Sequence, residues 1–250
     1  MKRHALIIGN AGESGAQNYC QGVAKDLFNY AAFLQSPLGG GWYSSEITKL
    51  DRPSCQSARA EIEVLKRADY SIAIFSGHGC TDSKINSLRL ELRTGQELSG
   101  NELGNGAKRH TAIFDCCRIV VSSTVTEERI LKAVKARAYM DVQTCRQYYE
   151  LAISKCPEGV VTMYACKLGE AAGDDAQSGG AYSSNLMLSA QNWSDIRNIN
   201  TTTDWDLYSV VEAHEAAKSR VEANPFTRQQ HPVLGNKPRS GPYFPFAVIA

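Results

Sequence analysis

Residues 71–80 read SIAIFSGHGC, a short apolar run that ends in His78 between two glycines. Residues 111–118 read TAIFDCCR and have the same form, ending in Asp115 and the pair Cys116-Cys117. Short apolar runs bounded by turn residues are typical of strands buried on both faces. The carboxyl ends of parallel strands meet at one edge of a sheet, where α/β proteins form their sites. The two segments therefore predict a sheet edge that presents an imidazole and a thiol together.

Similar runs recur along the chain and alternate with helical patterns. The predicted strands are Ala5–Ile8, Ile47–Leu50, Tyr70–Phe75, Thr111–Phe114, Val160–Tyr164 and Phe244–Ile249. Apolar residues at helical spacing predict helices over Val23–Leu34, Ala58–Ala68 and Ser209–Ala223. This alternation indicates right-handed βαβ crossovers. We therefore predict an α/β fold with a mostly parallel sheet of about six strands, flanked by helices.

An insertion separates the fourth and fifth predicted strands. Residues Thr126–Lys155 combine apolar residues at helical spacing with several basic ones, which indicates two helices or one broken helix. The chain contains no internal repeat and no linker rich in proline and serine. We therefore predict one domain over residues 1–250, interrupted by this insertion, rather than two domains.

Composition excludes several classes of protein. The 27 basic residues nearly balance the 26 acidic ones among 250, which gives no reason to expect a nucleic acid or an acidic membrane as the main partner. No run approaches the roughly 20 apolar residues of a membrane helix. The first apolar run is also far shorter than the about 7 residues that a secretory signal requires.

The eight cysteines are spread through the chain and form no CxxC pair. This pattern differs from a disulfide-stapled secreted scaffold and from a structural zinc site. We expect reduced thiols and a cytoplasmic protein.

The chemistry expected at the predicted sheet edge is acyl transfer. Cys117 would be the nucleophile and His78 the group that protonates the leaving amine. The backbone amides of Gly79 and Cys117 would hold the oxyanion. Taken alone, a Gly-His-Gly turn is an ordinary loop and a cysteine after a strand is an ordinary small apolar residue. Their occurrence at consecutive strand ends favours function.

These segments resemble the caspase-like cysteine peptidases, especially metacaspases and their bacterial relatives. The resemblance lies in Tyr19–Asp26, Phe75–Gly79, Phe114–Cys117, Tyr164–Ala172 and Gly179–Ser183, and it spans about residues 4 to 190. It implies a caspase-hemoglobinase-like fold, a protein substrate and no cofactor, with the second cysteine as nucleophile. It divides the chain into a large-subunit-like part (1–119), a helical linker (120–158) and a small-subunit-like part (159–250).

The resemblance also implies an acidic specificity pocket. The positions that line it in metacaspases are Asp26, Ser76 and Asp115 here. Carboxylates in a partly desolvated pocket attract a guanidinium, for which a bidentate contact is the best geometry. Cleavage after arginine, with lysine as a further candidate, follows as a hypothesis. The alternatives are a solvated helix carboxylate for Asp26 and a structural acceptor for Asp115.

The sequence departs from the family pattern after the nucleophile. Metacaspases usually continue with His-Ser-Gly, whereas this chain has Arg118-Ile119-Val120. Arg118 is therefore a candidate to fold back and fill the acidic pocket. The linker offers basic residues for self-cleavage, namely Arg129, Lys132, Lys135, Arg137, Arg146 and Lys155. Helical periodicity argues that much of it is protected.

Some metacaspases require calcium, but this sequence does not identify ligands for it. The pairs Asp174-Asp175 and Asp204/Asp206 are interpreted as solvated loop residues, because a hard cation needs six or more oxygen ligands. We predict no metal site.

The sequence thus predicts a cysteine endopeptidase that cleaves after a basic residue, with a bacterial defence or cell-death response as the setting by family analogy. Two alternatives remain. One is a catalytically silent caspase-like scaffold. The other is a flavodoxin-like nucleotide-binding module that uses Gly9–Gly15, although this stretch lacks the Gly-Lys-Ser/Thr ending of a phosphate loop. The oligomeric state is not predicted.

Overall fold

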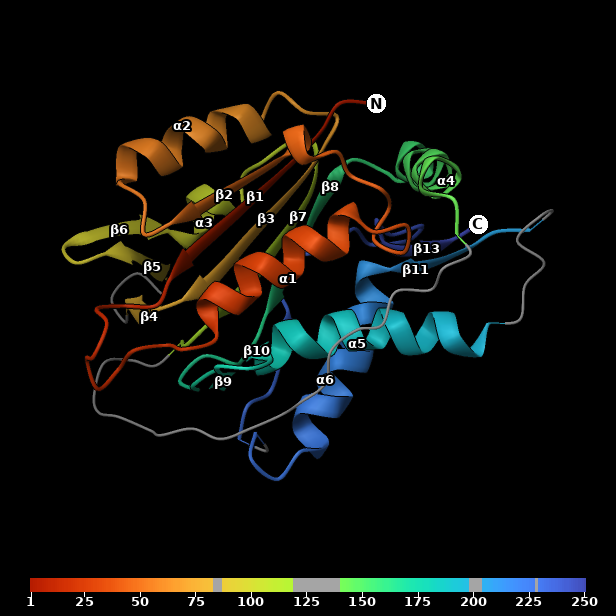
Figure 1. Ribbon diagram of the computed structural model, residues 1–250. Helices are drawn as coiled ribbons and strands as arrows, with labels where there is room; N and C mark the ends of the chain where they lie inside the picture. Colours follow the sequence, from red (N-terminus) through yellow and green to blue (C-terminus); the bar gives the residue numbers. More distant parts are fainter. Residues whose placement is uncertain (83–86, 119–139, 198–203, 228) are drawn as a thin grey trace.

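A six-stranded sheet forms the centre of the computed structural model, which describes residues 1–82, 87–118, 140–197, 204–227 and 229–250 (Figure 1). The strand order is β12-β8-β7-β3-β1-β2. Neighbouring strands from β8 to β2 pair in parallel, and the edge strand β12 pairs antiparallel with β8. The bounds are β1 Arg3–Asn10, β2 Ile47–Asp51, β3 Tyr70–Gly77, β7 Arg109–Cys116, β8 Gly159–Tyr164 and β12 Val233–Leu234.

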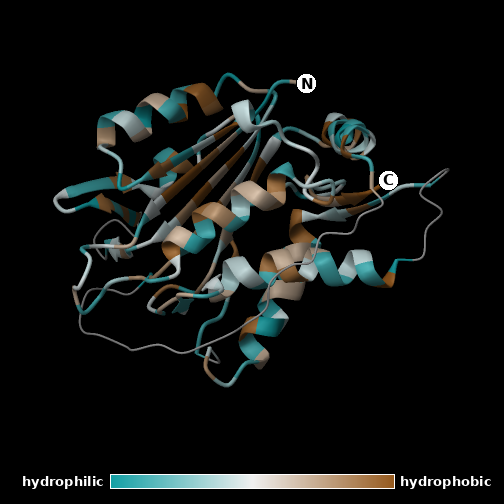
Figure 2. Ribbon diagram, in the orientation of Figure 1, coloured by the Kyte–Doolittle hydropathy of each residue, from teal (hydrophilic) through white to brown (hydrophobic). Residues whose placement is uncertain are grey.

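The strands form here because their residues can be buried on both faces of the sheet. Successive side chains of a strand point to opposite faces, and in β1 this sends Ala5 and Ile7 to one core while Leu6 and Ile8 enter the other. Figure 2 shows hydrophobic residues along the central strands and mixed polarity on the covering helices. The sheet is therefore held by two separate hydrophobic layers.

Different elements supply the two layers. The first packs against α1 (Val23–Gln35), α4 (Val142–Lys155), α5 (Ala181–Ile196) and α6 (Val210–Ala223). The second packs against α2 (Cys55–Leu65), α3 (Gly100–Leu103) and a small antiparallel sheet of β4 (Gly79–Asp82), β5 (Ser87–Arg93) and β6 (Gln96–Ser99). The remaining elements are the 3-10 helix η1 (Ser44–Glu46), the pair β9 (Asp174–Asp175) and β10 (Gly179–Gly180), and the pair β11 (Asp206–Ser209) and β13 (Pro245–Ile249).

The predicted fold class is confirmed, but one strand belongs to a different sheet. The run at Phe244–Ile249 forms β13, which pairs antiparallel with β11 and not with the central sheet. The sixth position is filled by Val233 and Leu234 of β12. A continuous apolar run indicates burial but does not identify the strand that completes its backbone hydrogen bonds.

The sequence interpretation missed several elements. The sheet β4-β5-β6 follows His78 directly, and α5 (Ala181–Ile196) lies in a stretch for which the sequence predicted no helix. In the insertion, α4 is one helix over its described part, and it carries Arg146 and Lys155. The other four candidate cleavage sites lie outside the described residues.

No helix in the described ranges is long and apolar enough to cross a membrane.

An ion-pair cluster fastens α4 to the amino-terminal half of the chain. Arg146 donates through both terminal nitrogens to the Glu46 carboxylate, each at 2.7 Å. The Arg3 guanidinium, whose side chain is fully buried, also lies 3.4 Å from Glu46. Burial opposes ionisation of Glu46, but hydrogen bonds from Arg146 and the Tyr43 amide, with the charge of Arg3, lower its pKa overall.

We expect Glu46→Gln to lower the free energy of unfolding at pH 7 by about 2 kcal/mol, because it removes one of the two carboxylates that pair with the buried Arg3 and Arg146 guanidinium groups and leaves only Glu150. Since the pKa of Glu46 is lower in the folded protein, its contribution is present above its unfolded-state pKa and is lost as the pH falls through the folded-state value. Urea unfolding of both proteins at several pH values measures this.

The control is Glu63→Gln, which removes the exposed pair with Lys66. This control should change stability by less than about 0.5 kcal/mol. An equal effect of the two substitutions would contradict a structural role for the cluster.

Candidate active site

The candidate site lies where β3 and β7 end side by side. Their register pairs Ser76 with Asp115 and Gly77 with Cys116. His78 and Cys117 are the next residue of each chain segment, so the two predicted catalytic residues leave the sheet at neighbouring points. The parallel order of the strands brings these segments together, although they are far apart in sequence.

The alternation of side chains along β7 distinguishes the two cysteines. Phe114 and Cys116 belong to the hydrophobic layer beneath α2, and Cys116 is 2% exposed. Asp115 and Cys117 lie one step out of phase with them and therefore face the side covered by α1. Cys117 is partly exposed there. Backbone geometry thus selects the second cysteine for the site.

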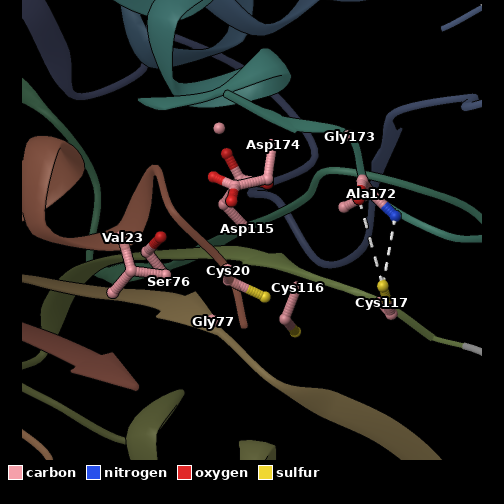
Figure 3. Close-up of a pocket in the computed structure, with 11 residues that line it drawn as sticks. Cys20, Val23, Ser76, Gly77, Asp115, Cys116, Cys117, Ala172, Gly173 and Asp174 are labelled. Carbon is pink, nitrogen blue, oxygen red and sulfur yellow. Dashed lines mark hydrogen bonds between the residues drawn. The ribbon is translucent and has the colours of Figure 1, made fainter. Parts of the chain in front are cut away.

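A recess at this edge encloses about 270 Å³ of empty space, including space open to solvent. Figure 3 shows Cys117, Asp115, Asp174 and Ser76 around it. The complete lining is Cys20, Val23, Ser76, Gly77, Asp115, Cys116, Cys117, Ala172, Gly173, Asp174 and Gly180. A thiol and two carboxylates therefore share one recess.

Asp26 and Asp115 are held at the base of the site by hydrogen bonds. The Ser76 hydroxyl donates to Asp26 at 2.5 Å, and the Gly180 amide lies 3.0 Å from the same carboxylate. Asp115 accepts from the Ser183 amide at 2.9 Å and from its hydroxyl at 2.6 Å. Asp26 is fully buried and does not line the recess, so the structure separates these two carboxylates into a rear and a front position.

The burial of these carboxylates changes their ionisation. Burial raises the pKa of Asp26 well above its ordinary value, and repulsion from Asp115 adds to the rise. Burial raises the pKa of Asp115 to about 6, despite the hydrogen bonds from Ser183. Like charges this close favour retention of a proton. A cation placed in the recess would relieve that repulsion.

The Cys117 sulfur contacts the loop that follows β8. The Ala172 amide donates to it at 3.4 Å. Burial raises the pKa of the Cys117 thiol, as do the nearby Asp115 and Asp174, while the Ala172 hydrogen bond acts in the opposite direction. In this conformation the thiol is therefore kept protonated rather than activated.

His78 contacts a different cysteine. Within the part of the chain that the structure describes, both ring nitrogens lie 3.7 Å from the Cys20 sulfur, and no hydrogen bond joins the ring to Cys117. Gly12, in the glycine-rich segment after β1, also lies against this ring. That segment does not open a helix, since α1 begins only at Val23. It therefore covers His78 and lacks the geometry of a phosphate-binding helix terminus.

Gly79 brings the loop after β3 against the loop after β7. A Cβ atom at this position would lie 2.7 Å from the Cys116 sulfur and 3.0 Å from the Cys117 carbonyl oxygen. Only glycine permits this approach without displacing the loop that carries Cys117. The backbone of Gly79 thus packs against the loop that carries Cys117.

One alternative from the sequence is wrong. Arg118 does not fold back into the acidic recess. Its guanidinium lies over the Tyr164 ring, 4.1 Å from the centroid, and donates to the Cys166 carbonyl at 3.3 Å. A cation over an aromatic face is a favourable arrangement, which holds Arg118 on the Tyr164 ring and away from the recess.

Asp174 was interpreted as a solvated loop residue, and the structure corrects this. It is in β9, it lines the recess, and its carboxylate accepts the Gly22 amide at 2.9 Å. The sequence offered only its position eight residues after Cys166 as a signal. Among the described residues, no group of three or more His, Cys, Asp or Glu side chains is placed to hold a metal ion.

Comparisons with known proteins identify relatives of this arrangement. Residues 2–239 match the family model of the caspase domain. Caspase-1 from Spodoptera frugiperda is similar in structure, with a TM-score of 0.54 and 11% identity over 94% of this chain and 86% of that one. A structural-genomics protein from Geobacter sulfurreducens has a TM-score of 0.61 and 18% identity over 100% of both chains. No curated protein sequence matches significantly.

We expect the Asp115 carboxyl to make stability fall as the pH rises. Its pKa is 3.8 in an unfolded chain and about 6 here, so the folded protein binds the proton more tightly. The free energy of unfolding should therefore decrease between about pH 4 and pH 7, by about 3 kcal/mol for a two-unit shift. Denaturant unfolding of Asp115→Asn should lack this component.

Asp141→Asn provides a control of opposite sign. Asp141 caps α4 and accepts from the Thr144 hydroxyl and amide, which lowers its pKa. The stabilisation that the ionised Asp141 carboxylate provides is lost as the pH falls. The free energies of unfolding of Asp141→Asn and the wild type should therefore converge in acid. A pH profile of Asp115→Asn that runs parallel to the wild type would show that folding does not raise the pKa of Asp115.

Proposed function

This chain belongs to the caspase family of cysteine peptidases, and on that premise we propose that it is an endopeptidase that cleaves after basic residues. Cys117 is the nucleophile and His78 the proton-transfer group. The observation that carries the proposal is the shared recess, in which the Cys117 thiol lies beside Asp115, Asp174 and Ser76.

The proposed reaction begins with attack of the Cys117 sulfur on the peptide carbonyl carbon. The backbone amides of Gly79 and Cys117 receive the negative charge that develops on the oxygen. His78 takes the thiol proton as the sulfur attacks and passes it to the amine as the C–N bond breaks; water then hydrolyses the thioester, which releases the acid product and regenerates the Cys117 thiol. These steps require the His78 ring to turn from Cys20 toward Cys117. An imidazolium beside the sulfur would then lower the pKa of the Cys117 thiol.

The acidic recess supports the proposed preference for a basic residue on the amino side of the cleaved bond (P1). Asp115 and Ser76 border the recess, while Asp26, which accepts from the Ser76 hydroxyl and the Gly180 amide, lies behind it. A guanidinium or ammonium placed there stabilises the ionised carboxylates, whose burial is otherwise unfavourable. An aspartate at P1 would meet repulsion at the same place.

Protein substrates follow from the family. A bacterial defence or cell-death response in the cytoplasm, in which a precursor protein is cut, is proposed here by family analogy alone.

The proposal predicts turnover of fluorogenic peptides with Arg or Lys at P1, and little with Asp or Leu. Cys117→Ala and His78→Ala should each lower kcat by at least about 1,000-fold, because both groups act in bond cleavage. Since Cys116 points into the hydrophobic layer, Cys116→Ala should keep kcat within about tenfold of the wild type. Initial rates with and without calcium measure all three.

A folded protein whose Cys117 can be alkylated, but which cleaves none of these peptides, would instead favour a catalytically silent caspase-like scaffold. The observation that supports this second candidate is that Cys117 contacts Ala172 and His78 contacts Cys20, rather than each other. Turnover that survives Cys117→Ala would contradict the assignment of the nucleophile.

We also expect Cys20→Ala to increase kcat/KM by about two- to tenfold. A contact of hydrogen-bond strength, about 0.5–1.5 kcal/mol, holds His78 away from Cys117 and would be lost. Cys55→Ala is the matched control, because the Cys55 sulfur contacts the Glu97 carbonyl at 3.2 Å, outside the recess. A lower kcat/KM in Cys20→Ala would show that Cys20 positions His78 for catalysis.

A further inference from the structure

We propose that Gln230 is a positioning residue for the nucleophile. Its side-chain amide joins the two ends of the loop over residues 165–173, and this loop holds the Ala172 amide as a hydrogen-bond donor to the Cys117 sulfur. The inference rests on the proposed function only in taking Cys117 as the nucleophile. It assigns a role to the segment that leads into β12, which is far from Cys117 in the sequence.

The central sheet itself brings Gln230 to this loop. Val233 of β12 is the antiparallel partner of Tyr164, the last residue of β8. The loop begins at the next residue, Ala165, and ends before β9 at Asp174. Gln230 lies shortly before β12 in the chain, so the pairing of the edge strand places it beside the start of the loop.

The Gln230 side chain contacts both ends of the loop. Its Nε2 donates to the Ala165 carbonyl at 3.0 Å, and its Oε1 accepts the Gly173 amide at 2.9 Å. The residue is 3% exposed. Buried polar groups need hydrogen-bond partners, and both of these partners are backbone groups of the loop. Gln230 therefore fixes the conformation in which the loop closes.

The middle of the loop is fastened on two sides. On one side, the Glu170 carboxylate accepts the His231 amide at 2.8 Å and lies 2.7 Å from the His231 Nδ1. On the other side, the Glu170 carbonyl accepts the Arg118 amide at 2.9 Å, and the Gly169 amide donates to the Arg118 carbonyl at 3.0 Å. The loop thus connects the Gln230–His231 segment to the residue that follows Cys117.

The end of the loop that Gln230 holds also contacts the nucleophile. Ala172 precedes Gly173, and its amide lies 3.4 Å and its carbonyl oxygen 4.0 Å from the Cys117 sulfur (Figure 3). A thiol can donate to the carbonyl, whereas a thiolate can only accept, and hydrogen bonds to a charged acceptor are the stronger ones. The Ala172 amide therefore stabilises the thiolate, the form that attacks, more than the thiol.

The test substitutes Gln230→Met, which removes both hydrogen bonds with a side chain of similar length. The rate of iodoacetamide labelling of Cys117 is followed by peptide mass spectrometry between about pH 6 and pH 10. The midpoint of this profile should rise by about one pH unit, because the loop no longer holds the donor on the sulfur. Under the proposed function, kcat for the arginine peptide should fall about tenfold while KM changes by less than about threefold.

The substitution leaves unchanged the described ionisable groups around the sulfur. These are Asp115, Asp174, Cys20, Cys116, Cys166 and His78. A shift of the labelling midpoint therefore reports the loop rather than a lost or added charge.

Two controls accompany this variant. Gln229→Met makes the same substitution at the exposed neighbouring residue and should keep the wild-type midpoint and kcat. Glu46→Gln lowers stability in a cluster outside the recess, and it should also keep the wild-type midpoint. The second control separates positioning of the loop from a general loss of stability.

Hydrogen exchange of the wild type tests the same contacts without a variant, which matters if Gln230→Met does not fold. The amides of Ala172 and Gly173 should exchange at least about 100-fold more slowly than an exposed amide, as measured by NMR. Exchange of both amides at the rate of an exposed loop would overturn the inference, because the donor would not be held.

The outcomes separate this inference from the proposed function. A wild type that cleaves no peptide overturns the proposed function, whereas the labelling profile still tests Gln230, since labelling requires only the thiol. An unchanged midpoint in folded Gln230→Met overturns the role of Gln230, whatever its activity. A higher kcat in this variant would also overturn it, because the loop would then obstruct Cys117.

Discussion

The site depends on two buried carboxylates that repel one another. Asp26 and Asp115 come from α1 and from the end of β7, and the same glycine, Gly180, packs against both. Without hydrogen bonds, such burial of two like charges would be prohibitive. Ser76, Ser183 and the Gly180 amide supply those bonds. The elements that carry these donors must therefore meet at this point, which determines where β10 and the start of α5 lie.

This constraint also explains why the site is unfavourable for the protein alone and favourable for a basic ligand. Burial raises the pKa of both carboxyls, and the same charges help to raise the pKa of the Cys117 thiol. A cation bound beside them would lower all three. Under the proposed function, binding of a basic substrate and activation of Cys117 are therefore linked through one electrostatic field, in keeping with the general observation that functional sites reduce stability.

The sequence predicted the fold class and the strands that carry the site, because both depend on local patterns. The apolar runs ending at Phe75 and Phe114 mark β3 and β7, and Val23–Leu34 marks α1 within one residue. The short strand β12 gave no such pattern, whereas β5 did: Leu88, Leu90 and Leu92 alternate with polar residues, a strand signal that the sequence interpretation did not use. Two-residue strands are too short for periodicity, and edge strands are defined by their partners. The roles of His78, Cys117, Asp26, Ser76 and Asp115 remain predictions that the geometry supports in different ways.

By itself, the sequence determined which chemistry is available at the sheet edge. An imidazole, a thiol and an aspartate follow buried strands, and strand alternation is a local property that separates Cys116 from Cys117. Only the tertiary structure decided which groups meet. It placed Asp174 in the recess, moved Asp26 behind it, stacked Arg118 on Tyr164 and paired His78 with Cys20. Each of these contacts joins residues distant in the chain or depends on a loop, and such contacts arise from packing rather than from local periodicity.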